Sequence, residues 1–274
     1  MAESGPQGRA EIRDILARHG LRPNQTLGQN FLVDPNVIRR IVRIADVEAG
    51  SSVVEIGGGT GTLTGALAST GARIVTYEID AGLVGVLEEM LGGLDNVEIR
   101  HADASRVNLT DELGGGPWSL VANLPYNVGT GIVLDALRFA PKVERFVVLV
   151  QREVADRLLA APGSRTYGLP SVIASLHARG SVAFKVPPTV FFPEPSIESA
   201  VVELTRRPAP DGAERAIEIA AAAFGQRRKM LRKSLSPTID EPAVVLERAG
   251  VDPTARPEDL APDDFVRIAA EVGE

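Results

Sequence analysis

The chain has 274 residues, of which 44% are hydrophobic and 24% are charged, and its formal net charge is −7. No apolar run approaches the roughly 20 residues that cross a bilayer, and the N-terminus lacks the basic and apolar regions of a secretory signal. The chain has no cysteine, which excludes disulfides, thiolate metal sites and a cysteine nucleophile. The histidines are scattered without the spacing of metal ligands, at His19, His101 and His177. We therefore expect a cytoplasmic protein with no membrane partner and no metal.

The negative net charge argues at first against a nucleic-acid partner, but its distribution along the chain changes that interpretation. Between Arg206 and Lys233 there are 8 basic and 3 acidic residues, a net charge of +5. From Ser234 to Glu274 there are 3 basic and 10 acidic residues, a net charge of −7. The acidic tail alone equals the charge of the whole chain, so a basic surface that binds nucleic acid is compatible with the composition.

In chain order, the first residues up to about Glu11 are predicted to be flexible, and a helical pattern then ends at Gly20. A polar, turn-rich stretch leads to Asp34-Pro35, which has the cap and first-position proline of a helix start. Beyond it strands and helices alternate, which predicts a parallel sheet with helices on both faces. The predicted strands are residues 52–56, 73–77, 97–100, 120–122 and 145–150, and the helices between and after them are 62–69, 81–91, 130–139 and 152–160.

Two late strands at 181–186 and 199–204 are predicted to pair antiparallel at one edge of the sheet. The Pro- and Gly-containing stretch 206–212 has the composition of a linker, and four helical patterns follow it, at 214–224, 229–235, 242–249 and 262–272. The expected fold class is α/β, with a small all-helical C-terminal domain. The expected parts are an N-terminal segment and helix, a catalytic domain and a helical RNA-contacting domain, at 1–26, 27–206 and 207–274.

A glycine-rich turn between the first predicted strand and its helix indicates a ligand site. Residues 53–64 read Val-Val-Glu-Ile-Gly-Gly-Gly-Thr-Gly-Thr-Leu-Thr, so Gly57 and Gly59 lie in the turn. Glycines let the backbone turn tightly and let a ligand approach main-chain atoms. Dinucleotide enzymes use a related turn, and a purely structural turn is a further alternative, so this element alone does not identify the ligand.

The ends of the next strands carry polar side chains in an informative order. Glu78 ends the second strand, where a ribose diol is usually held, and Asp103 follows the third, where it could accept from an adenine amino group. Asn123 follows the fourth strand, and ligands of open α/β sheets bind at this edge. The series resembles that of S-adenosylmethionine-dependent methyltransferases with a Rossmann-like sheet. A nicotinamide enzyme would need a hydride-acceptor site with a general acid, which the sequence does not show.

The tetrapeptide Asn123-Leu124-Pro125-Tyr126 resembles the Asn-x-Pro-Tyr motif of methyltransferases that modify the exocyclic nitrogen of adenine. The Asn123 side chain and the carbonyl of Leu124 or Pro125 could together hold one amino group through its two hydrogens. Tyr126 offers a face on which a base can stack. The alternative is an ordinary exit from a strand into a loop, in which Asn, Pro and Tyr are common.

Four further segments extend the resemblance to a family, at 27–32 (LGQNFL), 151–158 (QREVADRL), 191–202 (FFPEPSIESAVV) and 224–235 (FGQRRKMLRKSL). With the tetrapeptide, they closely resemble the bacterial small-subunit ribosomal RNA adenine dimethyltransferases of the KsgA/RsmA type. The similarity runs from about Leu27 through Phe265. It implies S-adenosylmethionine-dependent N6,N6-dimethylation of two adjacent adenosines near the 3′ end of 16S rRNA, in an immature 30S subunit, by a monomer.

The resemblance also assigns roles to individual residues. The family's cofactor contacts carry over by motif to Asn30, Leu32, Gly57, Glu78, Asp103 and Asn123, with Gly59 in the same turn. Phe191 or Phe192 would form a second wall of the base site opposite Tyr126, and core packing is an equal alternative for both phenylalanines. Two positions depart from the family pattern: Gly58 stands where proline is usual, and Gly129 stands where serine is common.

The basic run from Gln226 to Lys233 carries five basic residues and no acidic one, and we expect it to meet RNA phosphates rather than only water. Its members are Arg227, Arg228, Lys229, Arg232 and Lys233.

The sequence also leaves two other functions open. One is an adenine N6-methyltransferase of 23S rRNA, and the other is a ribosome-assembly or transcription factor that keeps the fold without catalysis.

Overall fold

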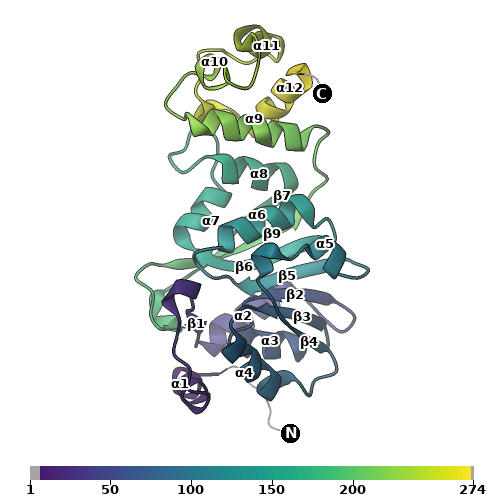
Figure 1. Ribbon diagram of the computed structural model, residues 1–274, viewed down its shortest axis with the longest axis vertical. Coiled ribbons are helices and arrows are strands. Elements are labelled where there is room, and N and C mark those ends of the chain that lie inside the picture. The colour runs from purple at the N-terminus through teal and green to yellow at the C-terminus, as the bar shows by residue number, and fades with distance from the viewer. Residues whose placement is uncertain (1–6, 273–274) are drawn as a thin grey trace. The chain divides into compact units, whose positions relative to one another are not determined.

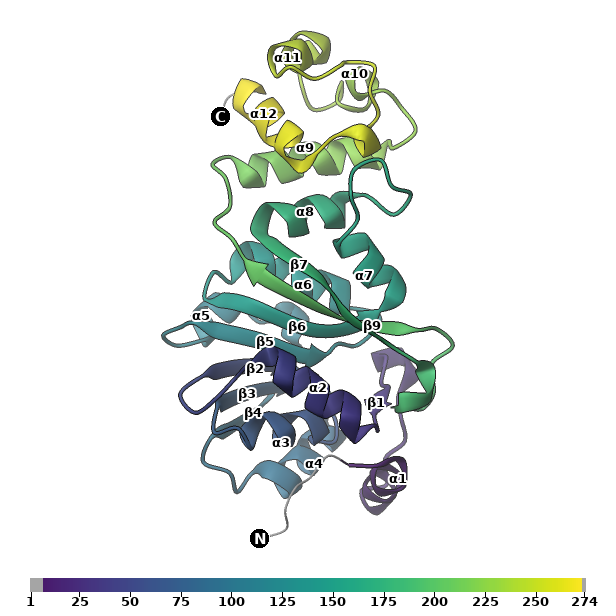
Figure 2. The same cartoon turned by 180° about the vertical axis from the view of Figure 1, so that it is seen from behind.

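The computed structural model describes residues 7–272, which form two compact units. The first unit holds the chain up to Ala155 together with Gly180–Thr205, and the second holds Asp156–Arg179 and the chain from Arg206 onward. Figures 1 and 2 show the elements of both units from opposite sides. Within residues 7–272, no helix has the length and apolar character needed to cross a membrane.

A seven-stranded sheet with the order β4-β3-β2-β5-β6-β9-β7 forms the centre of the first unit. The first five strands in this order, β4 to β6, pair in parallel, and β9 is antiparallel to β6. This confirms the predicted parallel sheet, and the two late strands are neighbours at one edge. The strand bounds are β2 Ser52–Ile56, β3 Arg73–Glu78, β4 Val97–His101, β5 Trp118–Asn123, β6 Val143–Gln151, β7 Ala178–Val186 and β9 Ser199–Arg206.

Helices cover both faces of this sheet, as the alternating pattern predicted. Figure 2 shows α2 and α3 in front of the strands, and Figure 1 shows α6 in front of the opposite face. The central strands are consequently continuous apolar runs, in which Val54, Val121 and Val147 are completely buried. The helix bounds are α2 Pro35–Ala45, α3 Thr62–Ala68, α4 Ala81–Leu91, α5 Leu109–Glu112 and α6 Gly129–Phe139.

Helix α2 begins where the sequence predicted. The carboxylate of Asp34 accepts hydrogen bonds from the backbone N–H groups of Asn36 (2.7 Å) and Val37 (3.3 Å), and Pro35 occupies the first helical position. These contacts satisfy two of the amides that a helix start leaves without intrahelical partners. The buried side chains of Ile38 and Ile41 then fix the helix on the sheet.

The N-terminal segment differs in part from the prediction. The helical pattern predicted to end at Gly20 is confirmed as helix α1, which spans Arg9–Arg18. Flexibility was expected up to about Glu11, but the helix already begins at Arg9, and Gln7 is buried; residues 1–6 lie outside the described chain. Ile12 and Leu16 of α1 pack into a cluster with Phe31, Val33 and Leu83. The expectation failed because the contacts that order this segment lie far away in the sequence.

A short strand pair was also not expected. Strand β1 (Phe31–Leu32) pairs antiparallel with β8 (Phe191–Phe192), so two of the family motifs meet. Arg9 of α1 lies against the same pair, because its guanidinium donates to the carbonyls of Thr189 (2.8 Å) and Phe191 (2.9 Å). Single two-residue strands carry too little periodicity to be recognised in a sequence.

The second unit is helical. Helix α9 packs against α8 and α12. Inside this unit, the ring of Phe224 contacts those of Tyr167 and Phe265. Helix α8 was not predicted. It belongs to this unit although it precedes residue 206, where the boundary between the domains was expected. The helix bounds are α7 Arg152–Leu158, α8 Leu169–His177, α9 Ala213–Gly225, α10 Leu231–Ser234, α11 Pro242–Arg248 and α12 Pro262–Val272. The boundary between the two units, after Ala155, falls within α7.

The glycine turn between β2 and α3 is confined on one side by β3. Gly57, Gly59 and Gly61 have φ values of 81°, 59° and 81°, which favour glycine at these positions. Gly58 has no such φ, but a Cβ atom there would lie 2.5 Å from the hydroxyl oxygen of buried Thr76. Thr76 therefore leaves no room for a side chain at position 58.

We predict that Gly58→Ala lowers the free energy of unfolding by about 1–3 kcal/mol, because the added methyl overpacks the contact with Thr76. The double variant Gly58→Ala/Thr76→Ala should lose less than the sum of the two single variants. Urea unfolding of the four proteins of this cycle measures the coupling. Additive losses would show that Thr76 does not exclude a side chain at position 58.

Candidate active site

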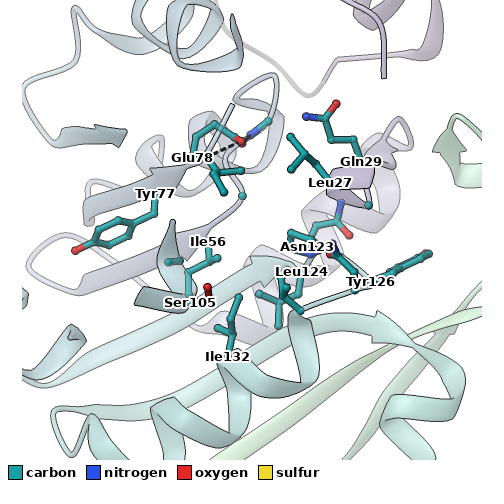
Figure 3. A pocket seen from close by; sticks show the side chains of 18 of the residues that line it. Leu27, Gln29, Ile56, Tyr77, Glu78, Ser105, Asn123, Leu124, Tyr126 and Ile132 are labelled. Carbon is teal, nitrogen blue, oxygen red and sulfur yellow. Dashed lines mark hydrogen bonds between the residues drawn. The ribbon is translucent and has the colours of Figure 1, made fainter. Parts of the chain in front are cut away.

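A pocket opens at the carboxyl ends of β2, β3, β4 and β5, the edge at which α/β sheets bind ligands. Figure 3 shows side chains from these separate segments around it. Nine of the residues predicted from the sequence line this pocket. They are Asn30, Gly57, Gly59, Glu78, Asp103, Asn123, Leu124, Pro125 and Tyr126.

Glu78 ends β3 and is bonded to the backbone on three sides. One carboxylate oxygen accepts from the N–H of Gly59 (2.9 Å), marked by the dashed line in Figure 3, and the other accepts from Ile79 (2.9 Å) and Asp80 (3.0 Å). Burial raises the pKa of Glu78, although these N–H groups act in the opposite direction. A carboxylate offers about four acceptor sites, so the glutamate holds the glycine turn and keeps capacity for a ligand hydroxyl.

Asp103 presents a second carboxylate with a different environment. Its Oδ1 accepts from the hydroxyl (2.6 Å) and the N–H (3.0 Å) of Ser105, and it caps the short 3₁₀ helix Ala104–Arg106. The Ser105 hydroxyl holds the pKa of Asp103 below its usual range. Asp103 is therefore ionised at neutral pH and carries its charge at the rim of the pocket.

The side chain of Asn123 is oriented by the segment that precedes the catalytic sheet. Its Nδ2 donates to the carbonyl of Asn30 at 2.9 Å. Because the amide nitrogen is engaged, Oδ1 is the atom left to accept from a ligand. Gly28 in the same segment has φ +66°, and a Cβ there would lie 3.1 Å from the backbone nitrogen of Tyr126. Close backbone approach thus brings the 27–32 motif onto the tetrapeptide.

The backbone after Asn123 resolves which carbonyl is available. The Pro125 carbonyl accepts from the N–H groups of Gly129 (2.8 Å) and Val128 (3.3 Å), so it closes the turn into α6. The Leu124 carbonyl accepts no hydrogen bond within the described chain, and Leu124 lines the pocket. Of the two carbonyls that the sequence left open, the structure leaves that of Leu124 for a ligand.

Tyr126 is anchored through its hydroxyl. The phenol oxygen lies 2.6 Å from the hydroxyl oxygen of Ser199, a fully buried residue at the start of β9. Burial raises the pKa of Tyr126, so the phenol stays protonated at neutral pH. Sequence analysis missed Ser199, although it lies within the 191–202 motif, because a serine on a strand gives no sign of the ring that it fixes.

Three predicted residues have positions that differ from the expectation. Phe191 is completely buried in the core between the sheet and α2, so it presents no face to a base and was wrongly assigned as a pocket wall. Leu32 is buried in the same cluster and does not line the pocket. Phe192 is half-buried, and its ring faces the guanidinium of Arg13 at 4.9 Å.

The comparisons with known proteins agree with this geometry. The family model described as ribosomal RNA adenine dimethylase matches residues 20–274. The chain belongs to this family. Its members dimethylate adenine in ribosomal RNA, so the chain is an rRNA adenine dimethyltransferase and S-adenosylmethionine is its methyl donor.

Individual relatives cover nearly the whole enzyme. It is 46% identical to "Ribosomal RNA small subunit methyltransferase A" of Kineococcus radiotolerans, with 95% of this chain and 89% of that protein covered. The protein of the same name from Cutibacterium acnes is 43% identical, with 98% and 95% covered. Among solved structures, the 23S rRNA methyltransferase ErmE is 27% identical with a TM-score of 0.67, covering 89% of this chain and 99% of that one.

A dimethyladenosine transferase from Plasmodium falciparum shares the fold, with a TM-score of 0.72, 21% identity, and 87% and 95% of the two chains covered. The Rossmann-like methyltransferase fold class predicted from the sequence is thus confirmed.

In the second unit, the basic segment 226–233 is a turn followed by the short helix α10 (Leu231–Ser234), which lies within the predicted helix 229–235 but is shorter. Arg227 is partly withdrawn from solvent, because its guanidinium contacts the carboxylate of Glu258 (3.3 Å) and donates to the Arg165 carbonyl (3.1 Å). The other four cations are exposed, namely Arg228, Lys229, Arg232 and Lys233.

Below the glycine turn, the enzyme buries a carboxyl group that sequence analysis did not single out. Glu55 on β2 is 1% exposed, and one of its oxygens accepts from the Thr64 hydroxyl at 2.6 Å. Burial raises the pKa of Glu55 from 4.5 to about 7. The folded enzyme therefore holds a proton on Glu55 between these pH values, where the unfolded chain has lost it.

Because the pKa is raised in the folded state, Glu55 makes stability fall as pH rises from about 4.5 to about 7, and the loss is then complete. We predict that Glu55→Gln removes this decline, worth about 3 kcal/mol by linkage. Urea unfolding of both proteins between pH 5 and 8 measures it. Parallel pH profiles for the enzyme and the variant would contradict the prediction.

Proposed function

We propose that the enzyme dimethylates N6 of two adjacent adenosines near the 3′ end of 16S rRNA, acting as a monomer on an immature 30S subunit in the cytoplasm. The observation that carries the proposal is the pair of acceptors at Asn123 Oδ1 and the Leu124 carbonyl, beside the glycine turn and two carboxylates. The choice of the small subunit is supported by relatives 40–46% identical, which bear small-subunit names.

The residues at the strand ends fit the methyl donor. The Glu78 carboxylate already accepts three hydrogen bonds and has room for one from a ribose hydroxyl. The ionised carboxylate of Asp103 suits an exocyclic amino group. Apolar Ile79 and Ile132 also line the pocket. Gly57, Gly59 and Asn30 would complete the cofactor contacts, and Leu32 would support them from the core. When bound, S-adenosylmethionine supplies an electrophilic methyl group on its sulfonium.

The protein's part in the reaction is to hold and orient an amine. The adenine amino group is a weak nucleophile because its lone pair is delocalised into the ring. Hydrogen bonds to Asn123 Oδ1 and the Leu124 carbonyl favour a pyramidal nitrogen whose lone pair is free to attack, without a strong base. After one transfer the methylated nitrogen releases one proton to water, so one N–H remains. One of the two acceptors still engages it, and the second methylation uses the same site.

Tyr126 supplies the stacking face for a base turned out of the RNA. Its hydroxyl contact with Ser199 limits rotation of the ring. Stacking therefore requires little reordering of the side chain when the base arrives. In the second unit, the four exposed cations of the 226–233 segment are proposed to contact phosphates, with Arg227 mainly holding the turn.

The 23S rRNA alternative is supported by the likeness to ErmE, which is lower in identity than the small-subunit relatives. A non-catalytic assembly factor would have no need to keep Asn123 oriented by Asn30 or the Leu124 carbonyl unoccupied. These observations favour catalysis on the small subunit.

We expect Asn123→Ala to reduce methyl transfer by about a hundredfold or more, because one of two orienting acceptors is lost. Affinity for S-adenosylmethionine should fall but stay measurable by calorimetry. The assay adds labelled cofactor to small or large subunits lacking the modification and maps the labelled nucleotide. Asn127→Ala is the matched control, since Asn127 lines the same pocket and donates to the Thr26 carbonyl. Near-normal turnover by Asn123→Ala, or label only in large subunits, would refute the proposal.

We expect Arg228→Glu/Arg232→Glu to weaken binding to small subunits and to flatten the dependence of log K on log salt by about 1.5 or more, because at least two phosphate contacts are lost. The control is Arg215→Glu/Arg248→Glu, which makes the same charge change at exposed positions of α9 and α11. Equal effects of the two pairs would indicate that only net charge matters and would remove the RNA role of the segment.

A further inference from the structure

The glycine turn is held by a side chain from the far N-terminal end of the described chain. Gln7 is 4% exposed, and its Nε2 donates to the Thr60 carbonyl at 3.0 Å. Its Oε1 accepts from the Thr62 hydroxyl at 2.8 Å, and the Thr60 and Thr62 hydroxyls lie 3.2 Å apart. One amide thus contacts both threonines of the Gly-Thr-Gly-Thr sequence that ends the turn and begins α3.

The turn itself has few side chains with which to restrain its backbone, because residues 57, 58, 59 and 61 are glycines. Its glycines occupy positive φ values, and glycine has more conformational freedom to lose than any other residue. Gly61, the N-cap of α3, has no side chain with which to cap the helix. The amide of Gln7 therefore supplies a long-range contact where the local sequence provides none.

The same N-terminal segment also supports the pocket through α1. Ile12 and Leu16 pack with Phe31 and Leu83, and both of these residues line the pocket. A Cβ on Gly59 would lie 3.3 Å from the ring of Phe31, so that ring lies directly against the turn. Docking of residues 7–18 therefore restrains the turn in two ways, directly through Gln7 and indirectly through the ring of Phe31.

We propose that Gln7 is a positioning residue for the cofactor, and that docking of residues 7–18 and cofactor binding are coupled. The docked segment holds the glycine turn in the conformation that receives the ligand, so a bound ligand in return stabilises the docked segment. Such coupling is reciprocal by thermodynamic necessity. The inference rests on the cofactor site proposed above.

The binding test measures the Kd of S-adenosylhomocysteine by calorimetry for the enzyme of 274 residues and its variants. Gln7→Ala should raise Kd about tenfold, because two buried hydrogen bonds that fix the turn are lost. Thr62→Val removes the partner hydroxyl at nearly constant volume and should raise Kd by a similar factor. The Kd of the double variant Gln7→Ala/Thr62→Val should not exceed that of the weaker-binding single variant. Arg18→Ala is the control, since Arg18 lies on α1 and its exposed guanidinium pairs with the exposed carboxylate of Glu89, a surface ion pair that contributes little; its Kd should stay within twofold.

Hydrogen exchange provides a readout that is independent of turnover. S-adenosylhomocysteine should slow amide exchange in α1 of the enzyme and of Arg18→Ala, and this slowing should be clearly smaller in Gln7→Ala, which keeps only the route through Phe31. A Kd within twofold of the unmodified enzyme for both Gln7→Ala and Thr62→Val would overturn the proposal, as would unchanged exchange in α1 on ligand binding.

Glu78→Gln separates this proposal from the one on which it rests. If Glu78→Gln weakens binding and Gln7→Ala does not, the cofactor site stands and the role of Gln7 is wrong. If neither variant changes Kd, the proposed cofactor site is itself wrong. Should Gln7→Ala unfold, thermal unfolding will show it, and Thr62→Val then decides the question.

Discussion

The hydrogen bond from Asn123 Nδ2 to the Asn30 carbonyl is the constraint on which the chemistry of the site depends. An asparagine side chain can turn either its oxygen or its nitrogen toward a ligand, and only the oxygen can hold an amine. Asn30 decides this orientation from a segment 93 residues earlier in the chain. The close packing of Gly28 on Tyr126, and the β1–β8 pair beside it, serve to keep that segment against the end of β5.

The carboxyl groups around the turn show how one small region creates different electrostatic conditions. Asp103, bonded to the Ser105 hydroxyl, has a lowered pKa and stays charged. Glu78 has a raised pKa because it is buried, yet three backbone N–H groups surround it. Glu55, bonded to Thr64 and almost without solvent contact, has a pKa near neutrality. Only the first two lie at the pocket, where ligand hydroxyl and amino groups would meet them.

Much of the architecture could be predicted because it is encoded locally. The strands are apolar runs, Asp34 and Pro35 mark a helix start, and the order Glu78, Asp103, Asn123 follows from where parallel strands end. What failed depends on distant partners. Helix α1 begins at Arg9, earlier than predicted, where Gln7 bonds to the turn and Arg9 to the 189–191 segment. Phe191 is buried because β8 pairs with β1 in the core. The role of Ser199 and the choice between the Leu124 and Pro125 carbonyls depend on geometry that spacing does not contain.

The most direct test of the central claim is a crystal structure of the enzyme with S-adenosylhomocysteine and an RNA fragment carrying the target adenosine. The account predicts N6 of the flipped adenine within hydrogen-bond distance of both Asn123 Oδ1 and the Leu124 carbonyl, with the ring stacked on Tyr126 and Asn123 Nδ2 still bonded to Asn30. An adenine amine bonded to the Pro125 carbonyl, or an Asn123 side chain released from Asn30, would contradict it.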